Sequence, residues 1–266
     1  LGNAVGSIIC DTALIIGLAS FIAPLSFDRA ATNRQGWFQL GAGFLLVAVS
    51  IPWLTIKGGF SVDGSISRFV GFGFVALLII YLVYSVKSVK KTDNIDGVSV
   101  VDEIVEHESS SSSSSAVVFI KMIAGIALII ISSKVLIPTV EISALRVGIP
   151  QSIIAATLVA FGTSLPELVT AITAARKGHG ELAIGNIIGA DILNVLFVVG
   201  VSASVTGAGL IVPSTFFTFQ FPVMILALLV FRGYTLFAKG AITRRHGAVL
   251  FGIYLIYLVS SFTLLG

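Results

Sequence analysis

A single carboxylate stands out in this sequence because it lies inside an otherwise apolar segment. Residues 160–168 read Ala-Phe-Gly-Thr-Ser-Leu-Pro-Glu-Leu, and Glu167 directly follows Pro166. A carboxylate at the centre of an apolar membrane helix costs on the order of 3 kcal/mol, so such a group is expected to face a cavity, a cation or a partner. Glu167 is therefore the first candidate for chemistry.

Pro166 predicts a local break in the helix that carries Glu167. Proline lacks a backbone N–H, and its ring clashes with the carbonyl four positions back. The break should free the carbonyls of residues 160–163, that of Ala160 among them, as oxygen ligands that line a cavity. The backbone therefore joins the list of candidate ligands.

Two hydroxyls precede Glu167 by three and four positions. Thr163 and Ser164 consequently lie on nearly the same face of the helix as the carboxylate. A carboxylate, hydroxyls and carbonyls form the all-oxygen set that hard cations such as Na⁺ and Ca²⁺ prefer, whereas a transition metal favours His or Cys. The alternative is a kinked helix whose Glu pairs with a basic residue, but no Lys or Arg lies near it within a predicted span.

An internal repeat supplies further oxygen groups. Residues 1–20 align without gaps to residues 184–203. The identical pairs are Gly2 with Gly185, Asn3 with Asn186, Gly6 with Gly189, Ile9 with Ile192 and Gly17 with Gly200. The two copies lie five predicted helices apart and should cross a membrane in opposite directions, an arrangement that places a substrate site near the bilayer midplane.

Polar residues follow the G-N-x-x-G core in both copies. Ser7 and Asp11, four positions apart, share one face of the first copy, and Asn194 lies in the second. Asp191 is a further candidate, although it could instead point into a water-filled vestibule. The glycines themselves permit close helix packing, and Asn3 and Asn186 are expected to bond across that contact or to help coordinate an ion.

The composition predicts a polytopic membrane protein. The 266 residues are 56% hydrophobic and 11% charged, and the mean hydropathy is +1.05. The apolar runs are continuous rather than alternating, which favours helices over barrel strands. The formal net charge of +3 comes from residues scattered among short loops, a topology signal rather than a nucleic-acid surface. We therefore expect an all-α fold that is built from transmembrane helices.

About eight spans follow from segments close to 20 apolar residues in length. They are predicted at 4–24, 39–56, 68–86, 117–137, 148–175, 181–204, 214–231 and 247–265. The chain then divides into a first half at 1–86 with about three spans, a flexible linker at 87–115 that ends in the seven serines Ser109–Ser115, and a second half at 116–266 with about five. The acidic part of the linker lacks the ligand pattern of an EF-hand.

Orientation follows from the distribution of Lys and Arg between the two sides. One side holds Arg29, Arg34, Lys87, Lys90, Lys91, Arg176, Lys177, Arg232, Lys239, Arg244 and Arg245. The other side holds Lys57, Arg68, Lys134 and Arg146. The positive-inside rule makes the first side cytoplasmic, which places the linker inside the cell and the C-terminus outside.

No enzyme class is indicated. His107, His179 and His246 all fall in predicted loops, and Cys10 is the single cysteine. The sequence contains no nucleophile elbow, phosphate loop or nucleotide fingerprint, so neither catalytic residues nor a cofactor are expected. No pattern specifies the oligomeric state.

The motifs G-T-S-L-P-E-L at 162–168 and G-N-I-I-G-A-D-I-L-N at 185–194 together resemble the second α-repeat of the cation/calcium exchanger superfamily. The opening G-N-A-V-G-S-I-I-C-D-T-A-L-I-I-G resembles the later half of its first α-repeat. The first half of that repeat, with its own carboxylate motif and two helices, is missing here. The resemblance implies an inverted-repeat fold of ten helices, built as five plus five, of which this chain would hold about eight. We expect the missing two to be cut or supplied elsewhere.

The resemblance assigns roles residue by residue. Glu167 matches the family's essential carboxylate, and its Na⁺ ligands are matched by Thr163, Ser164 and the carbonyl of Ala160. Ser7 and Asp11 match the Ser and Asn/Asp of the first repeat, Asn194 matches the Asn/Asp of the second, and Ala190 replaces a frequent serine.

The activity implied is exchange of Ca²⁺ for Na⁺ across a lipid bilayer, most simply the plasma (inner) membrane. Proton-coupled relatives often carry Glu where Gly6 and Gly189 stand, so these glycines favour Na⁺ as the driving ion. A proton-coupled cation exchanger of the same fold and a cation channel remain the alternatives.

Overall fold

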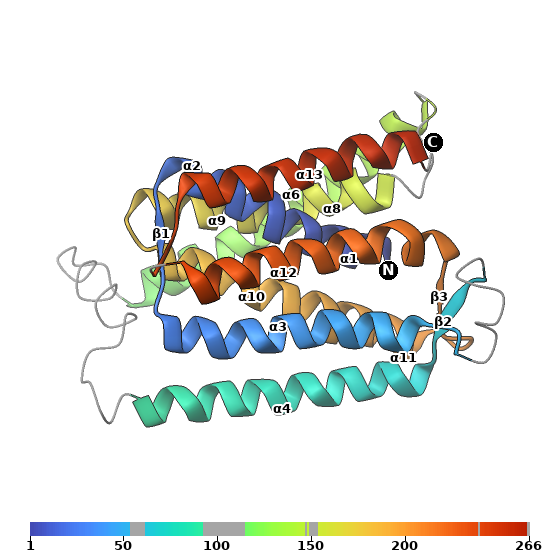
Figure 1. The fold of residues 1–266 in the computed structure, drawn as a ribbon, viewed down its shortest axis with the longest axis horizontal. Coiled ribbons are helices and arrows are strands. Elements are labelled where there is room, and N and C mark those ends of the chain that lie inside the picture. The colour runs from blue at the N-terminus through green and yellow to red at the C-terminus, as the bar shows by residue number, and fades with distance from the viewer. Residues whose placement is uncertain (54–61, 93–114, 147, 149–153, 239, 265–266) are drawn as a thin grey trace.

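The computed structural model describes residues 1–53, 62–92, 115–146, 148, 154–238 and 240–264. Helices dominate the described chain and lie side by side as a bundle (Figure 1). The predicted linker, Lys57, Lys239 and His107 fall outside the described residues, except that the ends of the linker continue two helices.

The first half consists of three helical segments separated by two short strands. A continuous helical run is formed by α1 (Gly2–Ile9), the π-helical turn η1 (Cys10–Ile15) and α2 (Ile16–Ile22). The elements that follow are β1 (Leu25–Ser26), α3 (Arg29–Ser50), β2 (Gly64–Ile66) and α4 (Arg68–Thr92).

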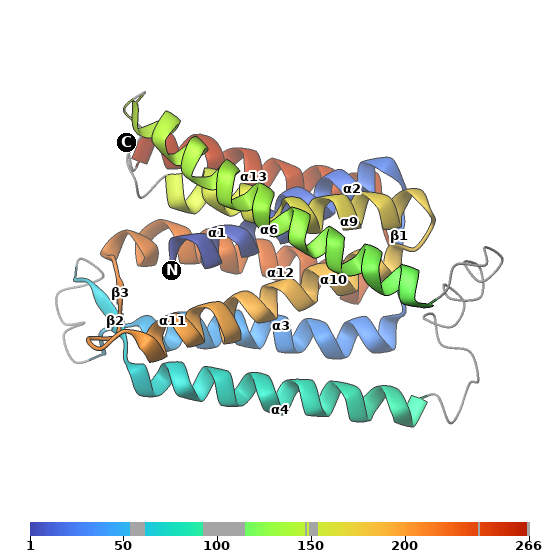
Figure 2. The same cartoon turned by 180° about the vertical axis from the view of Figure 1, so that it is seen from behind.

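The second half has the same order after two additional segments. Those segments are α6 (Ser115–Arg146), which crosses the bundle diagonally in Figure 2, and a broken helix formed by η3 (Ala155–Val159), α8 (Ala160–Thr163) and α9 (Leu165–Arg176). The repeat of the first half then comprises α10 (Gly180–Leu193), η4 (Asn194–Val199), α11 (Gly200–Val205), β3 (Leu210–Val212), η5 (Phe216–Gln220), α12 (Phe221–Phe237), β4 (Ala241–Ile242) and α13 (Arg244–Leu264).

The two copies of the repeat run in opposite directions. The run α1–η1–α2 ends at β1, whereas α10 begins beside β1, with Gly180 against the backbone of Ser26, and α11 ends near β3 at the other end of the bundle (Figure 1). The strands follow the same symmetry, because β1 pairs with β4 and β2 pairs with β3, both antiparallel. The predicted inverted repeat is therefore present in the structure.

Four glycines join the two halves in matching ways. Gly17 in α2 lies so close to α13 that an added Cβ would be 3.1 Å from the carbonyl oxygen of Gly247. Its repeat partner Gly200, at the start of α11, meets Gly71 of α4, where an added Cβ would lie 3.3 Å from the Gly71 oxygen. Small residues at such contacts allow helix backbones to approach closely in a membrane.

Five helical runs are long and apolar enough to cross a membrane, and the broken helix makes a sixth, counted over the described residues. The helical membrane fold is confirmed, while the count of eight spans and the division into two halves around a linker stay predictions. α3 and α6 are also long helices, of 22 and 32 residues.

The bounds of α3 differ from those predicted for its span. α3 begins at Arg29, ten residues before the predicted span, because the Asp28 carboxylate caps it by accepting from the N–H groups of Ala30 and Ala31. It ends at Ser50 because Pro52 forces the preceding residue into extended backbone. A prediction from the length of the apolar segment alone misses a first turn made of polar residues.

Arg232 and His246 lie in helices rather than in the loops expected for them. α12 continues past the predicted end at 231, so Arg232 is 3% exposed within it. Its guanidinium donates to the Asn33 side-chain oxygen and to the Thr235 hydroxyl and lies 4.6 Å from the Trp37 ring centroid. These partners offset the loss of hydration of a buried cation.

The glycine contact between α4 and α11 generates a stability prediction. Gly71→Ala should lower the free energy of unfolding by about 1–3 kcal/mol, because the new Cβ would lie 2.5 Å from the Ser204 nitrogen and 2.7 Å from the Gly200 oxygen. The measurement is the melting temperature of the purified protein in detergent. Gly73→Ala, two positions along the same helix and facing open space, is the control. Equal melting temperatures for the two variants would contradict the close packing.

Candidate ion-binding site

The helix that carries Glu167 is broken as predicted. Its two parts, residues 157–163 and 165–176, meet at an angle of 52°. Ser164 sits at the break with φ −89° and ψ 4°, and Pro166 occupies the first turn of α9, where a missing N–H costs nothing. The bend places Thr163 at the end of one segment and Glu167 at the start of the next.

The first repeat brings Ser7 to this break. The Ser7 hydroxyl lies 3.3 Å from the Thr163 hydroxyl and donates to the Ala160 carbonyl oxygen at 3.5 Å. The Thr163 hydroxyl is also within donating distance of the Asn3 side-chain oxygen, at 3.1 Å, and of the Ala160 oxygen, at 3.0 Å. Residues more than 150 positions apart in the chain thus form one cluster of oxygens.

This oxygen cluster, formed by Asn3, Ser7, Ala160 and Thr163, has few hydrogen-bond donors for its oxygens. Each hydroxyl carries a single hydrogen and two lone pairs, while the Asn3 and Ala160 oxygens only accept. The Ala160 oxygen also accepts from the backbone N–H of Ser164. Four oxygens facing two hydroxyl protons leave lone pairs free, which is the condition under which oxygens coordinate a cation.

Two carboxylates from different repeats follow the oxygen cluster along its two helices, four positions after Ser7 and four after Thr163. Asp11 in η1 is 1% exposed, and its Oδ1 atom has no hydrogen-bond partner. The Ser164 side chain contacts the Asp11 carboxylate, which also interacts electrostatically with Glu167. The Oε2 atom of the half-buried Glu167 is likewise buried without a partner. Buried carboxylate oxygens without donors are costly unless a cation satisfies them.

A third carboxylate, Asp191, is held by side chains from two other helices. Thr12 and Gln39 both donate to its Oδ2 atom at 2.6 Å, while Oδ1 has no partner. Asp191 is 2% exposed, which does not favour the alternative of a water-filled vestibule. The burial and the two donors place Asp191 inside the bundle, between the two copies of the repeat.

Thr12 and Gln39 were missed by the sequence analysis. Both are fully or almost fully buried, at 0% and 3% exposed. Gln39 opens the predicted apolar span 39–56, and an amide at that place was a visible signal. Thr12 directly follows Asp11, but no periodicity argument connects it to Asp191 in the other repeat.

Asn194 is a candidate ligand from the second copy of the repeat. It is half-buried at the first position of η4, and no hydrogen bond among the described residues joins it to Ser7 or Thr163. In the repeat alignment Asn194 corresponds to Asp11, and both residues lie in π-helical turns, η4 and η1. Such turns are frequent at functional sites, and they shift the side chains away from ordinary helical spacing.

The cluster is not a metal centre of acidic residues alone. Within the part of the chain that the structure describes, no three His, Cys, Asp or Glu side chains are grouped so that they could hold a metal ion. Any cation bound here would need hydroxyls and carbonyls as well as carboxylates, and the site residues stay predictions in that sense.

The profile of the family described as "Sodium/calcium exchanger protein" matches residues 1–87 and 117–263. The chain belongs to this family. Membership in a transporter family agrees with the expectation that the protein is not an enzyme and confirms the resemblance to the cation/calcium exchanger superfamily.

Two curated relatives illustrate how far the similarity extends. The chain is 39% identical over 144 residues to the sodium/calcium exchanger MaX1 of Methanosarcina acetivorans, a match that covers 53% of this chain and 39% of that protein. It is 30% identical over 233 residues to the inner membrane protein YrbG of Escherichia coli, covering 87% and 67% of the two chains. This exchanger-family chain therefore matches well under half the length of the first relative.

A solved structure of the sodium-calcium exchanger NCX_Mj, soaked with 10 mM Na⁺ and zero Ca²⁺, has the same fold. The TM-score is 0.70 at 25% sequence identity, and the match covers 97% of this chain and 76% of that chain. The exchanger fold expected from the sequence is thus confirmed.

The buried contacts of Asp191 generate a second prediction. Thr12→Val should destabilise the protein by about 1–3 kcal/mol, because the carboxylate loses a buried donor. The same change in an Asp191→Leu background should cost less, since no carboxylate is left unsatisfied. A double-mutant cycle of melting temperatures measures the difference. Additive effects of the two substitutions would contradict the hydrogen bond.

Proposed function

We propose that this protein is a secondary active antiporter that exchanges Ca²⁺ for Na⁺ across the membrane by alternating access. One observation carries the proposal: buried oxygens of Asp11 and Glu167 lack partners beside the oxygen cluster of Asn3, Ser7, Ala160 and Thr163. A cation supplies what these oxygens lack, and hard cations accept all of these ligand types.

The proposed ligands come from both repeats and from the broken helix. They are Glu167, Thr163, Ser164, Asn194, Asp11, Ser7, the carbonyl of Ala160 and Asp191. Glu167 and Asp11 supply most of the negative charge, and the hydroxyls with the Ala160 oxygen complete the coordination. Asp191 is oriented by Thr12 and Gln39, so that its free Oδ1 atom is the one that would approach an ion.

Competition for these ligands explains exchange. Carboxylates buried in a membrane protein are stable only when cations neutralise them, so the site holds either one Ca²⁺ or several Na⁺. An occupied site can change between inward and outward openings, whereas an empty, charged site changes poorly. This difference between occupied and empty states makes the protein an antiporter instead of a leak.

The inverted repeat supports alternating access. The ligand-bearing run of α1 and η1 crosses the broken helix, and its repeat partner α10–η4 runs the opposite way. Such pairs exchange roles when a transporter opens to the other side, with the site fixed near the midplane.

The proposed location is the plasma (inner) membrane. The ends of the helices at β1 carry most of the basic residues and would face the cytoplasm, which leaves the C-terminus outside. Ca²⁺ and Na⁺ are substrates in this proposal, and no resident cofactor is required.

Glu167→Gln should abolish Ca²⁺ transport while the protein remains folded, because the amide keeps the shape of the side chain and removes its charge. The assay is ⁴⁵Ca²⁺ uptake into proteoliposomes that contain the purified full-length protein, with Na⁺ inside. Glu181→Gln, an exposed carboxylate in the first turn of α10, is the control and should transport normally. Unchanged uptake in the Glu167 variant would rule out this site.

The driving ion can be tested in the same vesicles. Uptake should require internal Na⁺ and disappear when choline replaces it, because the all-oxygen site suits Na⁺. A pH gradient without Na⁺ should drive little uptake. Uptake that follows the pH gradient would instead identify a proton-coupled exchanger, and uptake indifferent to both gradients would identify a channel.

A further inference from the structure

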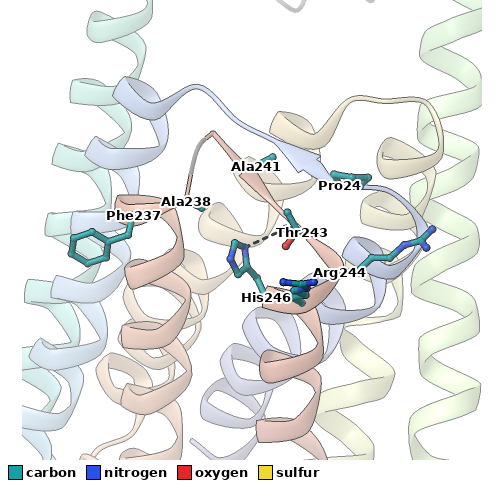
Figure 3. A pocket seen from close by; sticks show the side chains of 8 residues that line it. Pro24, Phe237, Ala238, Ala241, Thr243, Arg244 and His246 are labelled. Atoms are coloured by element: carbon teal, nitrogen blue, oxygen red, sulfur yellow. Dashed lines mark hydrogen bonds between the residues drawn. The ribbon is translucent and has the colours of Figure 1, made fainter.

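A pocket of about 840 Å³ opens at the end of the bundle where β1 pairs with β4. It lies between the end of α12 and the start of α13 (Figure 3). Its polar lining comes from Thr243, Arg244, Arg245 and His246, and Pro24 and Ala238 are among its apolar residues. None of the described residues that line it is acidic. The pocket is therefore positively charged, and its lining does not include Asp11, Glu167 or Asp191.

The donors of this basic pocket are available to a ligand. Within the described part of the chain, no hydrogen bond or ion pair occupies the guanidinium of Arg244 or Arg245. The Nδ1 atom of His246 accepts from the backbone N–H of Thr243 at 3.3 Å, which leaves Nε2 as the ring nitrogen that can donate. Arginine guanidinium groups and an imidazole N–H are donors to which the oxygens of an anionic headgroup can bond.

An apolar groove of about 500 Å³ continues from the basic pocket along the outside of the same helices. The two spaces share Phe237, Ala238 and His246, and Val230 and Val249 line the groove farther along. Gly233 leaves room in the groove, since a Cβ there would meet no atom within 4 Å.

The aromatic residues of the groove are placed where a membrane interface would be. The Tyr234 ring stacks on His246 with centroids 4.4 Å apart. Phe237 is 84% exposed and points away from the other lining side chains (Figure 3). An apolar groove that begins at a cluster of cations is complementary to a lipid with an anionic headgroup.

The position of the pocket also fits a lipid. α12 and α13 are both apolar enough to span a membrane, and the pocket lies at the ends of both. The same end of the bundle carries Arg29 at the start of α3 and Arg176 at the end of α9 (Figure 1). Basic residues mark the cytoplasmic side, and the cytoplasmic leaflet is the one that carries anionic lipids.

We propose that the basic pocket and the apolar groove together bind one anionic phospholipid. Its charged headgroup lies in the basic pocket among the donors of Arg244, Arg245 and His246, and one acyl chain lies in the groove past Gly233. The lipid would hold the turn between α12 and α13 to the bilayer surface. The site does not depend on the proposed exchange activity, because it contains none of the proposed ion ligands.

Native mass spectrometry of the delipidated, purified full-length protein tests this proposal. Phosphatidylglycerol should bind as one tight equivalent and phosphatidylcholine should not. Arg244→Gln should weaken phosphatidylglycerol binding roughly fivefold, and the Arg244→Gln/Arg245→Gln double variant about 30-fold. Arg68→Gln, at the first position of α4 and at the other end of the bundle, should leave binding unchanged. Circular dichroism and melting temperature confirm that each variant folds.

Two further arms separate a lipid from a free anion. Gly233→Leu fills the groove and should weaken phosphatidylglycerol binding at least fivefold, whereas Gly73→Leu, a matched exposed glycine in α4, should not. Inorganic phosphate should compete only weakly. Phosphate that binds as tightly as phosphatidylglycerol, insensitivity to Gly233→Leu, or equal losses for Arg68→Gln and Arg244→Gln would each overturn the lipid assignment.

Discussion

The structure of this exchanger-family protein depends on buried carboxylates that pair with no basic side chain among the described residues. Asp11, Glu167 and Asp191 all keep one oxygen without a donor, and the cationic side chain buried in the described bundle, Arg232, is engaged by Asn33, Trp37 and its own helix. Negative charge without a fixed counter-charge is unstable in an apolar surrounding. The bundle must therefore provide either donors, as Thr12 and Gln39 do for Asp191, or a place for a cation.

The inverted repeat explains how these groups meet. A helix that contributes Ser7 and Asp11 must cross the broken helix that contributes Thr163 and Glu167, and the two are more than 150 residues apart in the chain. Glycine contacts hold the neighbouring helices together around that crossing, since α2 packs on α13 in the same way that α11 packs on α4. Each contact brings two backbones together at a place where any side chain would separate them. The position of the oxygens is thus set by packing at a distance from them.

Irregular helix geometry has a consistent place in this fold. Proline breaks one helix at Ser164, and π-helical turns interrupt both copies of the repeat where Asp11 and Asn194 stand. Each irregularity changes which side chains share a face and redirects backbone carbonyls. The basic pocket at the α12–α13 turn is separate from these irregular helices. Its positive charge is complementary to a phosphate and not to a metal cation.

The sequence by itself determined the membrane class, the repeat and the break at Pro166, because apolar length and proline chemistry are local properties. The cation ligands that it predicts from the cost of a buried carboxylate stay a proposal. It could not place Gln39 and Thr12 on Asp191, since those contacts join three helices and no periodicity within one helix describes them. It misjudged the start of α3 and the surroundings of Arg232, because a polar residue at a helix end has the composition of a loop. Only the structure shows the Asp28 cap of α3 and the Trp37 ring beside Arg232. Only the tertiary structure decided which oxygens remain without partners, because satisfaction of a polar atom depends on neighbours from other helices.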